Sequence, residues 1–240
     1  MTIFYSHGDK GGVGKSLVSA VLIDYLIGIG RTPRVVEGDF KGADVAKRYA
    51  SSLNVEMVNL NRSGDAERAV LQFTDVITEA GDGGEDIVVN LPASAGDTIE
   101  ELAPVLIGVA EEAGHESRAF YALGHSEIAT GNFLETFNNG LFGLIAPEKR
   151  GVIYPLFLGA SESFHFVRSG ARDNYLAAGG LESAMPALKP NDFAVKVLST
   201  TGTFSSLLDK NTSPLGPGER FLLEKKWLRP ALDAVSVLVN

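Results

Sequence analysis

The residues between positions 10 and 16 have the composition and the setting of a phosphate-binding loop. They follow a strand-like apolar stretch, precede a helical pattern, and read Lys10-Gly11-Gly12-Val13-Gly14-Lys15-Ser16. Glycines permit the backbone angles that turn successive N–H groups toward one point, and the first turn of a helix adds further free N–H groups. We expect this loop to bind the phosphates of a nucleotide such as ATP.

Two side chains of the loop predict separate contacts. Lys15 is placed to reach the β- and γ-phosphates, and the hydroxyl of Ser16 is placed to bind Mg²⁺. Leu17 follows in the helix, so the candidate cofactor-binding segment is Lys10–Leu17. A glycine cluster that only formed a tight turn would not require two lysines and a serine at this spacing.

The loop departs from the general P-loop pattern at its first position. That pattern has glycine where this chain has Asp9, with Lys10 beside it. KGGVGKS resembles the deviant Walker A motif of the ParA/MinD superfamily of ATPases, in which the early lysine contacts the phosphates bound by the partner subunit. The resemblance therefore implies a nucleotide-dependent homodimer with ATP and Mg²⁺ as cofactors, and a catalytic role for Lys10 and Lys15.

Acidic side chains end the next expected strand. The segment reads Glu37-Gly38-Asp39, and in the superfamily that it resembles, two aspartates one residue apart lie near the γ-phosphate at this place. The resemblance implies that Asp39 is catalytic and holds the attacking water or a magnesium-bound water, with Glu37 as its structural neighbour. Orienting the water is most of the protein's task in this chemistry. The alternative is that Asp39 only starts a turn.

An asparagine stands where the superfamily has its Walker B aspartate. The segment is Asn90-Leu91-Pro92-Ala93, and an asparagine can hydrogen-bond a magnesium-bound water without bringing negative charge to a hard cation. The expected metal residues are therefore Ser16, Asp39 and Asn90, and hydrolysis is expected to be slow or to need a stimulating partner protein. Asp86 lies four residues earlier, about 13 Å back along a straight strand, which is too far to substitute.

The C-terminal third resembles one branch of the superfamily. Its segments Met185–Lys189, Thr203-Phe204 and Leu228–Ala234 are similar to an IPALK segment, a TF pair and a helix ending in LDAA in TraL-like conjugation ATPases. This resemblance implies that the protein serves conjugative DNA transfer, with plasmid partition and intracellular positioning as related settings. By the same analogy, the segment after the expected strand 152–158 contacts the adenine, although no base-binding residue can be named.

Strands and helices alternate along the chain and must position these residues. Strands are expected at 3–6, 34–37, 55–60, 86–90, 119–123 and 152–158, and helices at 15–28, 65–80, 98–113 and on either side of Pro230. This alternation predicts an α/β P-loop NTPase fold with a mostly parallel, twisted sheet and helices on both faces. A chain of 240 residues without a linker or repeat suits a single ATPase domain over 1–240.

The composition narrows the class of protein. The absence of cysteine excludes disulfides and thiolate metal sites, and no apolar run approaches the roughly 20 residues that cross a bilayer. The N-terminus has no basic segment before its apolar stretch, so we expect no signal peptide and a cytoplasmic location. A net charge of −9 argues against strong autonomous DNA binding and leaves weak binding open.

The other residues that could bind a metal or take part in catalysis are predicted to have packing or surface roles. His7, His115, His125 and His165 are widely spaced and are expected to be polar or packing residues rather than zinc ligands. Glu100 is expected on the solvated side of a helix. The basic segment 220–229, with Trp227, could lie on a membrane or touch DNA, as C-terminal parts of MinD and ParA proteins do, or it could simply pack on the sheet.

These observations favour an ATP-hydrolysing switch that dimerises around nucleotide and needs no further small-molecule substrate. Two alternatives stay open. One is a nucleotide-dependent regulator with little hydrolysis, which Asn90 would allow. The other is a ligase similar to dethiobiotin synthetase, which acts on a small acid with ATP; such a self-contained site would not obviously require Lys10.

Overall fold

A computed structural model describes residues 1–8, 11–40, 42–60, 66–92 and 96–239. Its strands form one seven-stranded sheet in the order β3-β2-β4-β1-β5-β6-β7, and every pairing is parallel. The strands are β1 (Thr2–His7), β2 (Arg34–Glu37), β3 (Val55–Met57), β4 (Ile87–Asn90), β5 (Glu116–Ala122), β6 (Arg150–Pro155) and β7 (Leu181–Met185). The predicted parallel sheet is therefore confirmed.

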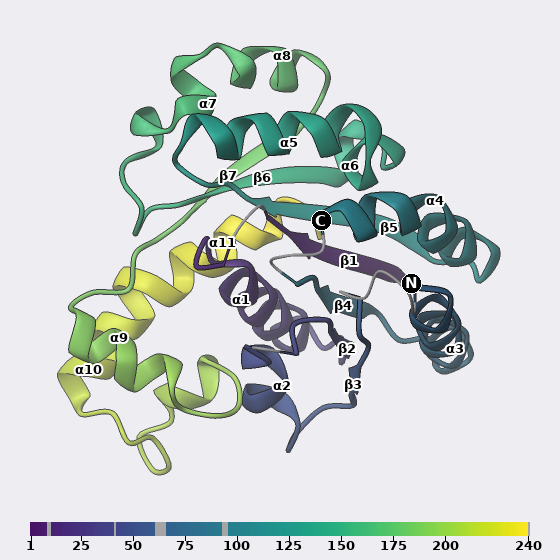
Figure 1. Cartoon of the computed structure of the whole chain (residues 1–240). Helices are drawn as coiled ribbons and strands as arrows, with labels where there is room; N and C mark the ends of the chain where they lie inside the picture. The colour runs from purple at the N-terminus through teal and green to yellow at the C-terminus, as the bar shows by residue number, and fades with distance from the viewer. Residues whose placement is uncertain (9–10, 41, 61–65, 93–95, 240) are drawn as a thin grey trace.

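Helices cover both faces of the sheet, as predicted (Figure 1). On one face lie α3 (Ala66–Gly83), α4 (Gly96–Glu112), α5 (Glu127–Asn139), α6 (Leu141–Leu144), α7 (His165–Arg168) and α8 (Ala171–Ala177). On the other lie α1 (Lys15–Gly28), α2 (Asp44–Tyr49), α9 (Asn191–Leu198), α10 (Pro217–Leu222), the π-helical turn η4 (Leu223–Leu228) and α11 (Arg229–Ser236). Short 3-10 turns lie at η1 (Pro147–Lys149), η2 (Ser161–Ser163) and η3 (Ser205–Leu208).

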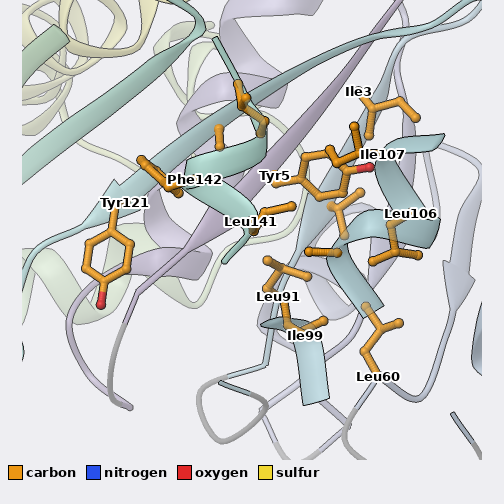
Figure 2. Close-up of a cluster of buried hydrophobic side chains, with 14 of the residues drawn as sticks. Ile3, Tyr5, Leu60, Leu91, Ile99, Leu106, Ile107, Tyr121, Leu141 and Phe142 are labelled. Carbon is orange, nitrogen blue, oxygen red and sulfur yellow. The ribbon is translucent and has the colours of Figure 1, made fainter. Parts of the chain in front are cut away.

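The central strands β1 and β4 are buried at every position, which explains the apolar runs Ile3–Tyr5 and Ile87–Val89 within them. Phe4 and Val88 pack toward α1, whereas Tyr5 and its neighbours pack toward α3 and α4. Figure 2 shows this second core, with Tyr5 from β1 and Ile107 from α4 drawn among its members. Because side chains alternate along a strand, the side chain of the last residue of each strand points to a defined face of the sheet.

Several element boundaries differ from the sequence prediction. The expected strand 55–60 is only three residues long, and β7, which was not predicted, adds an edge strand. Helix α3 continues through Gly81 to Gly83, because the backbone turns to positive φ only at Gly84. None of the helices in the described ranges combines the length and the apolar character that a membrane crossing requires.

The chain ends in one continuous helical run rather than in two helices separated by Pro230. Helix α10 passes through the π-helical turn η4 directly into α11, and Pro230 lies in the first turn of α11. Because proline has no backbone N–H, it leaves a carbonyl group of the preceding turn without its usual helical donor. A wider π-helical turn at this place changes the hydrogen-bonding pattern, so proline is tolerated there. Helix α11 packs along α1, so α1 is buried on nearly all sides.

Candidate nucleotide-binding site

The glycine-rich loop joins the end of β1 to the start of α1. Gly12 and Gly14 have positive φ angles of 84° and 98°, which favour glycine. A Cβ atom at Gly8 would lie 2.7 Å from the carbonyl oxygen of Ala122, so glycine lets β1 end close against β5. A Cβ at Gly11 would meet nothing within 4 Å, and this side of the loop is exposed. The predicted catalytic residue Lys10 lies outside the described residues.

The N-terminus of α1 has no side-chain cap. Gly14 is its N-cap and has no side chain to accept from the first-turn N–H groups, and that turn contains no acidic residue. Free N–H groups and the helix dipole together favour a negatively charged ligand. Lys15, which is buried, and Ser16, which is half-buried, begin the helix at this point. The described part of the loop therefore fits a phosphate group.

Three neighbouring strands end side by side below this loop. Asn90 on β4 is in register with Ser6 on β1 and with Glu37 on β2. Residues in register on parallel strands point to the same face, and here that face is the one covered by α1. The Ser6 hydroxyl donates to the carbonyl oxygen of Lys15 at 3.0 Å, which ties the start of α1 to β1.

Asn90 connects this row to the loop. Its Nδ2 donates to Oε1 of Glu37 at 2.8 Å and to Oγ of Ser16 at 3.3 Å, and its Oδ1 accepts from the Ser19 hydroxyl at 3.2 Å. The amide nitrogen of Asn90 thus faces Ser16, and the amide oxygen faces Ser19. The hydroxyl of Ser16 is the oxygen at this point that could bind Mg²⁺, and the carboxylate of Glu37 is connected to it through the Asn90 amide.

Glu37 is fully buried and receives four hydrogen bonds. Besides the Asn90 amide, the N–H groups of Asp39, Val45 and Ala46 donate to its carboxylate at 3.0, 3.1 and 3.2 Å. Desolvation raises the pKa of Glu37, and these four hydrogen bonds act in the opposite direction without cancelling the rise. The sequence predicts Glu37 only as a structural neighbour of Asp39, whereas the register of β2 on β4 places it beside Asn90.

Asp39 lies in the turn between β2 and α2. Its N–H group donates to Glu37, and its Oδ1 accepts from the Gly42 N–H at 3.1 Å. The turn ends at Ala43, which has a left-handed φ of 45°. The structure therefore brings Ser16, Asn90 and Glu37 into one hydrogen-bonded group, and Asp39 joins it through its backbone while its carboxylate orders the turn.

Two contacts near the loop were not predicted from the sequence. Nε2 of His7, the last residue of β1, lies 3.1 Å from Oε1 of Glu100 on α4, so Glu100 is not a solvated surface residue. The ring of Phe157, in the segment after β6, would lie 3.3 Å from a Cβ atom at Gly14. No spacing pattern in the sequence links either residue to the loop.

The remaining candidates have packing contacts. The His7 ring packs edge-on against Tyr121, and His125 lies 3.1 Å from the Ser163 hydroxyl. Within the described ranges, no group of three acidic or histidine side chains could hold a metal ion. In the basic C-terminal segment, Trp227 is buried and donates to the carbonyl oxygen of Pro186 at 3.0 Å, while Lys226 is exposed. Packing on the sheet accounts for the buried Leu223, Trp227 and Leu228, whereas Phe221 and Leu222 of the same segment are exposed.

A parallel sheet in this strand order, with a glycine-rich loop between β1 and α1, defines the P-loop NTPase fold. Known structures agree. A chain of the MinC:MinD cell division protein complex of Aquifex aeolicus has 13% identity and a TM-score of 0.55, with 100% of this chain and 96% of that chain covered. Apo McdA of Cyanthece has 12% identity and a TM-score of 0.54, with both chains fully covered.

The likeness extends to a broader group of P-loop proteins. The signal recognition particle receptor FtsY of Elizabethkingia anophelis has 15% identity and a TM-score of 0.52, with 80% of this chain and 60% of FtsY covered. These identities show the fold alone, and at that level the resemblance to MinD-like proteins is confirmed. In sequence, Protein MobD of Acidithiobacillus ferrooxidans is 40% identical over 62 residues, which are 26% of this chain and 27% of MobD. No family model matches the chain.

Proposed function

We propose that this chain, acting as a single domain over residues 1–240, is an ATP-binding switch that dimerises around its nucleotide and hydrolyses ATP slowly or with a partner protein. The observation that supports this proposal most directly is the uncapped N-terminus of α1, which begins with Lys15 and Ser16 beside the buried Asn90–Glu37 pair. Anion-binding N–H groups, a lysine and a polar site for a cation at one point suit a nucleoside triphosphate.

Each residue of the site has a proposed task. The segment Gly11–Leu17 holds the phosphates, with Lys15 neutralising their charge. Ser16 would hold Mg²⁺ through its hydroxyl, with Asp39 and Asn90 as the further metal-site residues; the ion supplies charge neutralisation on the phosphates when bound. Asp39 orients the attacking water. Lys10 is proposed to contact the phosphates bound by the partner subunit.

The setting of this switch is proposed from the resemblances. Similarity of the C-terminal segments to TraL-like ATPases favours conjugative DNA transfer, with plasmid partition or intracellular positioning as related settings. A stimulating partner protein, and DNA or a membrane as the working surface, belong to the same proposal. A regulator with little hydrolysis is the second candidate, because the side chain that faces Ser16 at the end of β4 is an amide rather than a carboxylate.

Nucleotide binding is tested by titrating the protein with a fluorescent ATP analogue and Mg²⁺. The Lys15→Ala variant is expected to bind at least about tenfold more weakly, because a hydrogen bond to a charged group contributes roughly 1.5–3 kcal/mol. Lys47→Ala is the control, since Lys47 is an exposed lysine on α2. Equal affinity of the wild type and Lys15→Ala would reject the proposed site.

The dimer is tested by light scattering without nucleotide, with ADP and with ATP. We expect a dimer with ATP for the wild type and a monomer under all conditions for Lys10→Ala. ATP binding by both proteins without any dimer would reject the two-subunit switch. An ATP-dependent dimer that needs no small acid would argue against the ligase alternative, and phosphate release would separate the hydrolase from the regulator.

A further inference from the structure

The ends of β2 and β4 hold a carboxylate and an amide in contact. Glu37 and Asn90 are 0% and 1% exposed, they are in register, and Nδ2 of Asn90 lies 2.8 Å from Oε1 of Glu37. Both side chains lie beneath the loop, and one hydrogen bond from Asn90 reaches Ser16. The two residues therefore form one buried pair directly beside the start of α1.

The carboxylate of Glu37 fixes the orientation of the Asn90 amide. An ionised carboxylate only accepts hydrogen bonds, so the amide nitrogen rather than the oxygen must face it. The hydroxyl of Ser19 can donate, which suits the amide oxygen on the other side. With the amide held in this way, its second N–H points to Oγ of Ser16 at 3.3 Å. Glu37 thus acts on Ser16 through Asn90.

The same contact explains why position 90 carries no charge. An aspartate in place of Asn90 would put a second carboxylate oxygen about where Nδ2 now lies, 2.8 Å from Oε1 of Glu37. Two buried carboxylates at this separation repel strongly, because the protein interior screens charge poorly. One negative charge fits the pair, and in this chain it is on β2 rather than at the end of β4.

We propose that Glu37 is the positioning residue that supplies the negative charge of the nucleotide–magnesium site, acting through Asn90 on Ser16. This role requires a carboxylate at one of positions 37 and 90 and an amide at the other. This inference rests on the proposed function and deepens it, since it assigns the charge that the Walker B position lacks. The carboxylate remains one residue removed from Ser16 and holds its hydroxyl in place for the cation.

A second set of contacts decides how the proposal must be tested. The other oxygen of Glu37 accepts from the N–H groups of Val45 and Ala46 at the start of α2. A Glu37→Gln variant therefore changes the acceptor for these N–H groups as well as the charge, because only one of its two terminal atoms accepts hydrogen bonds. A double-mutant cycle separates the coupling between positions 37 and 90 from the effects that each substitution has alone.

The cycle compares the wild type, Glu37→Gln, Asn90→Asp and the double variant. Two quantities are measured: the affinity for a fluorescent ATP analogue as Mg²⁺ is raised from zero, and the urea midpoint of unfolding without nucleotide. We expect Asn90→Asp alone to reduce the Mg²⁺-dependent gain in affinity about tenfold and to lower the urea midpoint. Adding Glu37→Gln is expected to restore most of the Mg²⁺-dependent gain and to raise the midpoint again.

Asn90→Ala is the matched control, because it removes the amide without adding a charge. It is expected to unfold at a higher urea concentration than Asn90→Asp. The proposal is overturned if Asn90→Asp binds the Mg²⁺ complex as tightly as the wild type, or if the two substitutions have additive effects on the Mg²⁺ dependence. If the two substitutions are coupled in the urea midpoint but not in the Mg²⁺ dependence, the pair is purely structural, and this result would also overturn the proposal. A wild type that binds no nucleotide would instead reject the proposed function, whereas the unfolding cycle would still report the charge coupling.

Discussion

Nε2 of His7 lies 3.1 Å from Oε1 of Glu100, which fastens the last residue of β1 to α4 on the face of the sheet opposite α1. The other carboxylate oxygen of Glu100 accepts from the Leu141 N–H at the start of α6. The His7 ring also packs against Tyr121 of β5. Because Gly8 and the loop follow His7 directly, this contact holds the strand end from which the loop departs.

The Glu100 carboxylate gives this contact a pH dependence. Desolvation acts to raise the pKa of Glu100, but hydrogen bonding to His7 and attraction by it, with further contributions from Thr136 and the Leu141 N–H, outweigh it and hold the pKa below the ordinary value of 4.5. The unfolded chain then binds the proton more readily, so the stabilisation is present above that ordinary value and is lost as pH falls through the lower folded pKa. We expect Glu100→Gln to lower the urea midpoint at neutral pH, and its difference from the wild type to shrink as the pH falls below the ordinary carboxyl pKa.

The matched control is Glu101→Gln, because Glu101 is the next residue of α4 and is exposed. Its urea midpoint is expected to follow that of the wild type at every pH. A difference between Glu100→Gln and the wild type that stays constant down to the acid limit would contradict the prediction, since it would show a packing effect instead of a charge effect.

Gly14 is a loop position where a side chain is expected to be poorly tolerated. Its φ angle is 98°, and a Cβ atom would lie 3.3 Å from the Phe157 ring. Gly14→Ala is expected to lower the free energy of unfolding by ~1–3 kcal/mol, the usual cost of a residue other than glycine in such a conformation. Chemical denaturation measures the change, and titration with a fluorescent ATP analogue measures the accompanying loss of affinity.

Two variants separate the causes of that loss. Gly11→Ala has neither a positive φ nor any atom within 4 Å of the added Cβ, so its unfolding free energy is expected to stay near that of the wild type. In a Phe157→Ala background the ring contact at Gly14 is removed. The destabilisation by Gly14→Ala that persists there measures the backbone strain alone. No destabilisation by Gly14→Ala in either background would show that the loop adopts another conformation.

The sequence predicted those parts of the fold that leave a local pattern. The strands β1, β2 and β4 are buried and each contains a short run of β-branched or aromatic residues, which predicts a strand from the sequence. Strand β7 is half-buried at the sheet edge and has the sequence Leu-Glu-Ser-Ala-Met, which shows little periodicity. Helix α3 was ended too early because Gly81 looks like a helix terminator, although nothing forces the backbone out of the helix before Gly84.

The sequence predicts the candidate residues that lie in contiguous motifs, but it does not predict the contacts between residues on different strands. The loop residues and Asp39 follow contiguous motifs, and Asn90 was noticed because it replaces an expected aspartate. The contact of Asn90 with Glu37 depends on the register of two strands that are about fifty residues apart in sequence, which a motif cannot express. Glu100 was assigned to a solvated helix face because its partner His7 belongs to a different strand–helix unit.

Arg48 is expected to hold the segment that follows α9 against α2. It is buried, its guanidinium carbon lies 3.8 Å from the centroid of the Phe204 ring, and its Nη1 donates to the carbonyl oxygen of Val197 at 3.3 Å. Arg48→Ala removes the stacking, the hydrogen bond and the packing of the aliphatic stem. We expect the free energy of unfolding to fall by ~2–4 kcal/mol, measured by chemical denaturation.

Arg48→Lys tests whether the flat guanidinium matters beyond its charge. Lysine keeps the charge but cannot stack and donate in the same plane, so this variant is expected to lose a large part of the stability lost by Arg48→Ala. Lys47→Ala is the control for removing a neighbouring exposed cation. Full stability of Arg48→Lys would contradict the prediction and reduce the contact to a simple charge effect.

Trp227, the single tryptophan of the chain, reports on the basic C-terminal helix. It is 1% exposed, packs edge-on at 4.8 Å from Phe204, and donates to Pro186, so the indole belongs to the core rather than to a membrane-facing surface. We expect its fluorescence to be blue-shifted in the folded protein and unchanged when vesicles of anionic phospholipid are added. The doubly substituted variant Trp227→Phe/Phe221→Trp moves the probe to a position that is 59% exposed on the same helical run. A vesicle-induced shift from the tryptophan at position 221 alone would show that the exposed side of this helix contacts lipid while the core stays intact. A shift from Trp227 would mean that this helix leaves the sheet to bind lipid.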